Sequence, residues 1–121
     1  MRCRGIRGAT TVPENTKEAI IAASKELLQH IIEANEVRTS DVACVLFTTT
    51  PDLNAAFPAA AARELGWTQV PLLCGQEIDV PGSLSHCLRI LVLFNTNKGI
   101  EEIVHVYLRG TEILREDDDK K

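Results

Sequence analysis

The chain lacks several patterns that mark common classes of protein. None of its four cysteines (Cys3, Cys44, Cys74 and Cys87) forms a C-x-x-C pair, and its three histidines have no ligand spacing relative to them, so we expect no metal site. In a chain of net charge −4 there is no basic stripe with interleaved aromatic residues, which argues against nucleic acid as a partner. There is also no glycine-rich phosphate loop and no nucleotide motif.

Long apolar runs are missing too. No stretch approaches the ~20 residues that a membrane-crossing helix needs, and the N-terminus lacks the apolar region of a signal peptide. Three of the cysteines lie in or beside apolar runs, where a free thiol behaves as a small hydrophobe. We therefore expect a cytoplasmic protein that makes no membrane contact.

The length and composition fit one globular domain. With 45% hydrophobic and 25% charged residues over 121 positions, the chain can form a single core. We expect this domain to span residues 1–115. The charged residues 116–121 are expected to form a disordered tail.

Hydrophobic periodicity predicts an α+β fold. Runs of strand formers predict about five strands, at 2–12, 42–49, 70–74, 87–94 and 104–108. Residues 16–34 have an apolar and a polar side at helical spacing, with Asn15 and Glu18 at the spacing of a capping box. Pro58 and Gly66 bound a short helix over 59–65, and residues 100–103 are expected to form one helical turn. One long helix cannot cover both faces of such a sheet, so we expect an oligomer.

Arg89 is the most informative residue, because it lies inside the apolar run 87–94, which predicts a strand buried on both faces. A desolvated guanidinium without a partner costs several kcal/mol, and Glu77, after the third strand, is the candidate partner. One interpretation is a buried structural ion pair. The other is that the guanidinium faces a cavity and binds an anionic ligand.

Other side chains also stand in unusual settings. Gly5 and Gly8 bracket Arg7, which is either a solvated strand arginine or one with cleared space for a ligand. Phe57 lies in a loop, where a ligand wall or a subunit contact would explain it. Tyr107 points away from the expected core face of its strand. Several converging arginines would select a small molecule with more than one carboxylate.

Five blocks of sequence together resemble one family. They are RGIRGATTV at 4–12, TPDLNAAFPAAAAREL at 50–65, CGQEIDVPG at 74–82, Arg89 in its apolar strand and HVYLR at 105–109. In this order, over about residues 2–115, they resemble the monofunctional AroH-class, Bacillus-type chorismate mutases. The resemblance implies a mixed sheet, a homotrimer with active sites between subunits, and conversion of chorismate to prephenate in phenylalanine and tyrosine biosynthesis without a cofactor.

The resemblance also implies roles for the inner residues. Arg89 is similar to the arginine that binds the ether oxygen of the breaking bond and a carboxylate. Arg7 and Tyr107 are similar to groups that hold a substrate carboxylate. Glu77 and Cys74 match the partners of the ring hydroxyl and its surroundings.

Further residues match the outer parts of the family's site. Phe57 is similar to an apolar wall supplied across the interface, with Arg63 near the cleft mouth. Leu114 and Arg115 match a C-terminal segment that closes over the ligand. Ala60 stands where Bacillus-type sequences carry a lysine, so we expect different electrostatics at the entrance.

Two other functions fit the same residues. One is a trimeric regulatory module that binds small carboxylates without converting them. The other is an imine-hydrolysing trimer of similar architecture, in which Glu77 would be the base that activates water. No Ser-His-Asp or Cys-His arrangement is evident, which agrees best with a unimolecular rearrangement that needs positioning and charge stabilisation.

Overall fold

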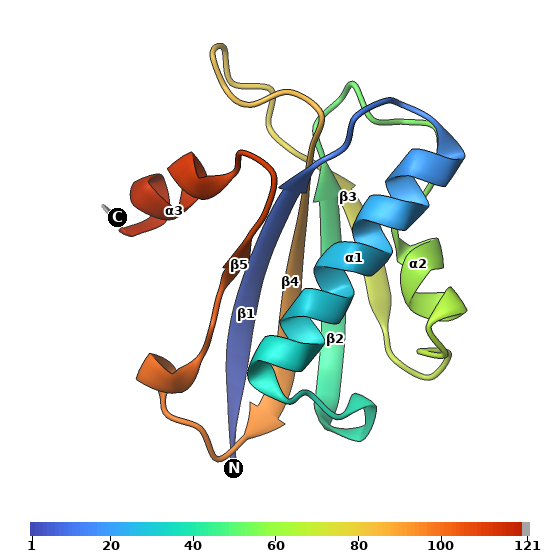
Figure 1. Ribbon diagram of the computed structural model, residues 1–121. Helices are drawn as coiled ribbons and strands as arrows, with labels where there is room; N and C mark the ends of the chain where they lie inside the picture. Colours follow the sequence, from blue (N-terminus) through green and yellow to red (C-terminus); the bar gives the residue numbers. More distant parts are fainter. Residues whose placement is uncertain (120–121) are drawn as a thin grey trace.

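A five-stranded sheet organises the structure, a computed structural model that describes the backbone of residues 1–119 and the side chains of residues 1–115 (Figure 1). The strands are β1 (Arg2–Thr11), β2 (Val42–Thr49), β3 (Leu72–Gln76), β4 (Cys87–Thr96) and β5 (Val106–Tyr107). The α-helices are α1 (Lys17–Asn35), α2 (Ala59–Glu64) and α3 (Glu112–Asp119), with short 3-10 helices η1 (Thr39–Asp41) and η2 (Ile100–Glu102). The predicted α+β class is confirmed. Among residues 1–119, no helix combines the length and apolarity needed to cross a bilayer.

The sheet is mixed, with strand order β3-β2-β4-β1-β5. β4 is antiparallel to both of its neighbours, β1 and β2, whereas β3 runs parallel to β2 and β5 parallel to β1. Because β4 is central and carries Arg89, this side chain lies between the residues paired with it, Ala9 on β1 and Thr48 on β2.

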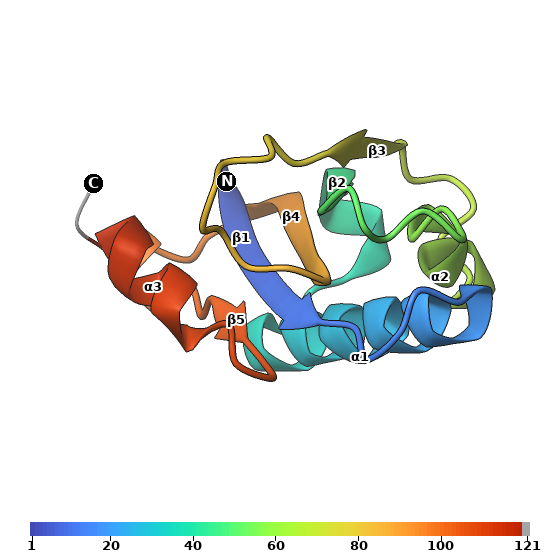
Figure 2. The ribbon, with the colours of Figure 1, turned by 90° about the horizontal axis from the view of Figure 1, so that it is seen from above.

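Both α1 and α2 cover the same face of the sheet (Figures 1 and 2). The core forms there, since alternate residues of β4, among them Leu88, Ile90 and Val92, are fully or almost fully buried with the apolar side of α1. Gly8 of β1 allows α1 to pack closely against the sheet, because a Cβ atom at this position would lie 2.6 Å from the Cδ1 atom of Ile31.

The opposite face, which we call the open face, has no α1 or α2 over it (Figure 2). Leu46, Arg89, Leu91 and Leu93 are half-buried there, and Leu73 is 64% exposed. The prediction that the 87–94 strand is buried on both faces is therefore wrong for a single protomer. The expectation that one long helix leaves apolar sheet surface uncovered is confirmed.

Element ends differ from the sequence prediction in several places. Thr16, not Asn15, caps α1, with its side chain accepting a hydrogen bond from the Ala19 N–H at 3.2 Å. The third strand begins at Leu72 instead of residue 70, since Pro71 has no N–H to donate to a strand ladder. β5 is only two residues long, since the backbone of Val104 before it pairs with the Asn35 side chain instead of with a strand; the Val104 residue is 47% exposed.

The C-terminal segment is helical over Glu112–Asp119, so the tail predicted to be disordered continues α3 through residue 119. An acidic residue in the first turn, Glu112, favours this helix start electrostatically. Residues 120–121 of the predicted tail lie outside the described residues.

Candidate active site

A cavity of about 290 Å³ opens on the open face of the sheet, beside Arg89. Its lining includes Arg7 from β1, Thr48 from β2, Arg89 from β4 and Tyr107 from β5. The order of the strands brings these side chains together, although they are up to 100 positions apart in sequence. Three of the residues singled out from the sequence thus share one cavity.

Arg89 forms the ion pair predicted with Glu77. Its Nε atom lies 3.1 Å from Oε1 of Glu77, and the two side chains are 38% and 25% exposed. The Nε–H is not directed at the carboxylate, so Nε is buried without a hydrogen bond among the described residues. Both interpretations of Arg89 therefore hold in part, because the guanidinium is paired and also lines a cavity.

The backbone of Glu77 fixes where its carboxylate starts. The Glu77 N–H donates to the carbonyl oxygen of Thr49 at 2.8 Å, just after the last residue of β3. Because β2 ends at Thr49, this bond holds Glu77 at the same end of the sheet as Arg89.

The C-terminal segment reaches the same place from the other side. Arg115 lies over the ring of Tyr107, with its guanidinium carbon 5.1 Å from the ring centroid, and Leu114 is half-buried. Thr111 anchors the segment, since its buried hydroxyl donates to the carbonyl oxygens of Leu108 at 2.7 Å and Ala9 at 3.1 Å.

Phe57 and Cys74 lie in a different hollow, of about 500 Å³, which shares no lining residue with the cavity at Arg89. Phe57 is 74% exposed. Its loop is held by Asn15, whose Oδ1 atom accepts the N–H groups of Asn54 and Ala55, each at 3.0 Å. Within one protomer, the structure does not bring these two residues to Arg89.

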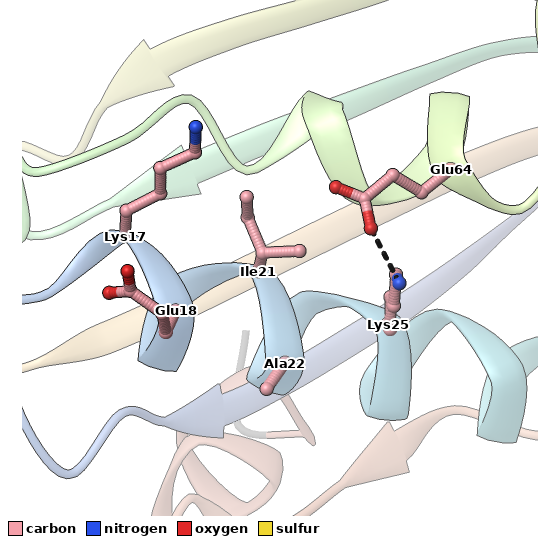
Figure 3. A pocket seen from close by; sticks show the side chains of 6 residues that line it. All are labelled: Lys17, Glu18, Ile21, Ala22, Lys25 and Glu64. Carbon is pink, nitrogen blue, oxygen red and sulfur yellow. Dashed lines mark ion pairs between the residues drawn. The ribbon is translucent and has the colours of Figure 1, made fainter.

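Arg63 also stands apart from the cavity, exposed in the last turn of α2. A further hollow of about 400 Å³ lies between α1 and α2, with Lys17, Ile21 and Lys25 in its lining (Figure 3). Lys25 Nζ contacts Glu64 Oε1 at 2.6 Å across it, which ties the two helices together. We assign this hollow no function, since Lys25 and Glu64 in its lining are paired with each other.

Two ionisable groups near the start of β4 are perturbed. Burial raises the pKa of the Cys87 thiol, and the nearby Arg89 charge offsets this only in part. Burial acts against the charged form of Asp52, but hydrogen bonds from the Thr50 hydroxyl and the His86 N–H outweigh it and lower the pKa of this carboxyl.

Sequence reasoning missed part of the cavity. Thr48 lies opposite Arg89 on the neighbouring strand, and its buried hydroxyl has no hydrogen-bond partner among the described residues. Leu46 and Leu91 supply apolar walls. Alternation along the two strands would have placed all three on the face of Arg89, had the register been known.

The arrangement favours binding over proton transfer. Two guanidinium groups and a phenol line the cavity, and among the side chains of residues 1–115 no three His, Cys, Asp or Glu gather as metal ligands would. Arginine side chains with apolar walls suit a small carboxylate ligand. The fold and the site thus define a class: an α+β protein with an arginine-lined cavity for a small anionic molecule.

Comparisons with known proteins narrow this class. The model of the family described as chorismate mutase type I matches residues 3–118. Chorismate mutase AroH of Bacillus subtilis is 48% identical over 118 residues, covering 97% of this chain and 93% of that protein. Chorismate mutase AroH of Thermus thermophilus is 50% identical over 115 residues, covering 94% of each.

A solved structure agrees with the sequence comparisons. The chorismate mutase from Clostridium thermocellum superimposes with a TM-score of 0.89 at 48% identity, over 91% of this chain and 98% of the other. The chain belongs to the type I chorismate mutases, and its function is that of an isomerase of this family. The family resemblance predicted from the sequence is confirmed.

Proposed function

We propose that the protein converts chorismate to prephenate, on the route to phenylalanine and tyrosine, in the cavity beside Arg89. The observation that carries this proposal is that Arg7, Arg89 and Tyr107, from three different strands, line one cavity. Chorismate has two carboxylates, which arginine side chains bind well. The buried Arg89 Nε, already desolvated, gains from a ligand oxygen at little further cost.

Arg89 carries the chemistry in this proposal. The rearrangement breaks a C–O bond and forms a C–C bond within one molecule, so it needs no nucleophile or general base. Negative charge grows on the ether oxygen in the transition state, and a guanidinium fixed in advance stabilises it without solvent reorganisation. Glu77, 3.1 Å from Arg89 Nε, restrains the guanidinium. In this proposal Glu77 and Cys74, three residues earlier in sequence, bind the ring hydroxyl and its surroundings.

The other groups restrain the substrate. Arg7 and Tyr107 hold a carboxylate, so that the flexible enolpyruvyl arm lies over the ring before the reaction begins. Leu114 and Arg115 belong to the segment that closes over the ligand, supported by the stacking of Arg115 on Tyr107. The entropy lost in this arrangement is lost on binding, before the chemical step.

We further propose a homotrimer whose sites lie between protomers, with Phe57 and Arg63 of one facing Arg89 of the next. Two observations support it: the open face leaves Leu73 64% exposed, and Phe57 is 74% exposed in a hollow separate from the Arg89 cavity. Apolar side chains exposed to this extent are typical of protein interfaces.

The activity is tested by incubating the purified protein with chorismate and following its loss and the formation of prephenate by chromatography. A carboxylate-binding module would leave chorismate unchanged. An imine hydrolase would act on an imine and not on chorismate. Either result would refute the proposed reaction.

The shared site is tested by mixing two inactive variants, Arg89→Ala and Phe57→Asp, and reassembling them together. Suppose that each site uses Arg89 of one protomer and Phe57 of its neighbour. In an equal mixture, roughly a quarter of the sites then combine an intact Arg89 with an intact Phe57. Each variant reassembled alone is the control. A mixture no more active than the mean of the two controls would contradict a site between protomers.

We also propose a cytoplasmic location, because all four cysteines are free thiols and one of them, Cys3, is exposed. Cell fractionation with an antibody to the protein tests this location. Recovery with membranes or outside the cell would contradict it.

A further inference from the structure

The segment 77–86, between β3 and β4, extends beyond the end of the sheet and has no regular secondary structure (Figure 1). Hydrogen bonds tie both of its ends to the sheet. At the first end the Glu77 N–H donates to the Thr49 carbonyl at 2.8 Å, and at the other Val12 donates to the His86 carbonyl at 2.8 Å. The segment therefore begins with the carboxylate that pairs with Arg89 and ends three residues before Arg89 itself.

Asp52 holds the far end of this segment. Both of its carboxylate oxygens accept the backbone N–H of His86, Oδ1 at 3.1 Å and Oδ2 at 3.0 Å. The Thr50 hydroxyl donates to Oδ1 of Asp52 at 2.5 Å and orients the carboxylate. The same hydroxyl accepts the Cys87 N–H at 3.0 Å, so two consecutive N–H groups at the start of β4 are held by side chains that follow β2.

The backbone at this point needs such support. His86 has a φ of +50°, in the left-handed region that is unfavourable for residues other than glycine. Hydrogen bonds to a charged acceptor are among the stronger ones in proteins, and here they stabilise the conformation that turns the chain into β4. The His86 ring faces the same carboxylate, with Nε2 3.8 Å from Oδ2 of Asp52.

We propose that Asp52 is a positioning residue for the mutase reaction: by holding the end of segment 77–86, it keeps Glu77 against Arg89. Asp52 lines neither the cavity at Arg89 nor the hollow at Phe57, so we expect it to act through segment 77–86 and not by touching the substrate. Both ends of the segment are anchored at the C-terminal end of β2, and releasing one end frees the Glu77 side chain to leave the guanidinium. This inference rests on the proposed role of Glu77 and Arg89.

The test is a double-mutant cycle between Asp52→Ala and Glu77→Gln, with kcat and KM for chorismate measured on folded, fully assembled protein. Asp52→Ala alone should lower kcat/KM about ten- to a hundredfold, as misplaced catalytic groups do. In the Glu77→Gln background the same change should lower it less than about twofold, because the group it positions is already gone. Asp52→Asn, which keeps an acceptor for the His86 N–H, should recover most of the activity and serves if the alanine variant does not fold.

Asp79→Asn is the matched control, since Asp79 is an exposed carboxylate in the same segment, and it should keep wild-type kinetics. Equal losses from Asp52→Ala in the two backgrounds, or wild-type kinetics in folded Asp52→Ala, would overturn the inference. A Glu77→Gln protein with wild-type kinetics would instead show that the proposed role of Glu77 fails, and the inference with it. A chain that does not convert chorismate at all refutes the proposed function before Asp52 is tested.

Discussion

Replacing Arg89 by alanine is the most direct test of how the cavity works. The change removes the guanidinium that lies between the cavity and Glu77, and leaves the apolar walls Leu46 and Leu91 in place. The partner strands β1 and β2 pair with β4 on both sides of this position, so the backbone is expected to stay as it is.

The expected loss of kcat follows from the role of Arg89 as a fixed hydrogen-bond donor to an oxygen on which negative charge develops. Losing one such donor typically lowers kcat about 10²–10³-fold, or about 2.7–4 kcal/mol of transition-state stabilisation. We expect at least this loss, because the Arg89 Nε is buried, where an electrostatic contact is stronger than in water. Arg89→Lys should recover only part, since an ammonium has no planar fork of donors.

The assay separates binding from chemistry. kcat is measured at saturating chorismate, and the free energy of unfolding is measured in urea, because Glu77 loses its cation and the partly exposed pair contributes on the order of 1 kcal/mol. Arg38→Ala, which removes an exposed arginine outside the cavity, is the control. A kcat close to that of wild type in Arg89→Ala, with only KM raised, would refute electrostatic stabilisation by this residue.

Four further outcomes are expected. kcat should be nearly flat around neutral pH because no proton moves in the reaction, and a bell centred near pH 7 would contradict this mechanism. Gly8→Ala should destabilise the fold by about 1–3 kcal/mol in urea unfolding, because its Cβ would lie 2.6 Å from Ile31 Cδ1, and unchanged stability would mean that α1 can shift freely. Thr16→Ala should lower the free energy of unfolding by about 1 kcal/mol through loss of the helix cap, whereas no change would show that the cap bond is replaced by water. Cys87 should resist alkylation near pH 8 until the protein unfolds, since it is buried and its thiol pKa is raised; rapid labelling of the native protein, located by mass spectrometry, would disprove that burial.

Pairing of Arg89 with Glu77 could be predicted from sequence, because a guanidinium in an apolar strand requires a partner and few carboxylates follow the preceding strand. The N-terminal cap of α1 could not be predicted from sequence. Asn15 and Glu18 have the spacing of a capping box, but the Asn15 side chain instead binds backbone N–H groups of residues 54 and 55, far along the chain. Local spacing carries no information about such a distant competitor for the same oxygen atom.

The sequence also could not predict which face of β4 is buried in a protomer. A continuous apolar run indicates a strand with two apolar faces, and only the placement of the helices decides that Leu91 and Leu93 stay half-buried in a protomer. The same placement leaves Phe57 exposed in one hollow while Arg89 lines another. A pattern along one chain cannot show which of its surfaces meets a second copy.

Alone, the sequence determined the α+β class, the long helix and the presence of arginines in apolar or glycine-flanked settings, because these follow from periodicity and from the cost of burying charge. Tertiary structure decided which of those arginines meet. The cavity exists because the strand order sets β1 beside β4 and β5 beside β1, so that Tyr107, Arg7 and Arg89 converge on one face. This order depends on long-range pairing that no local pattern contains.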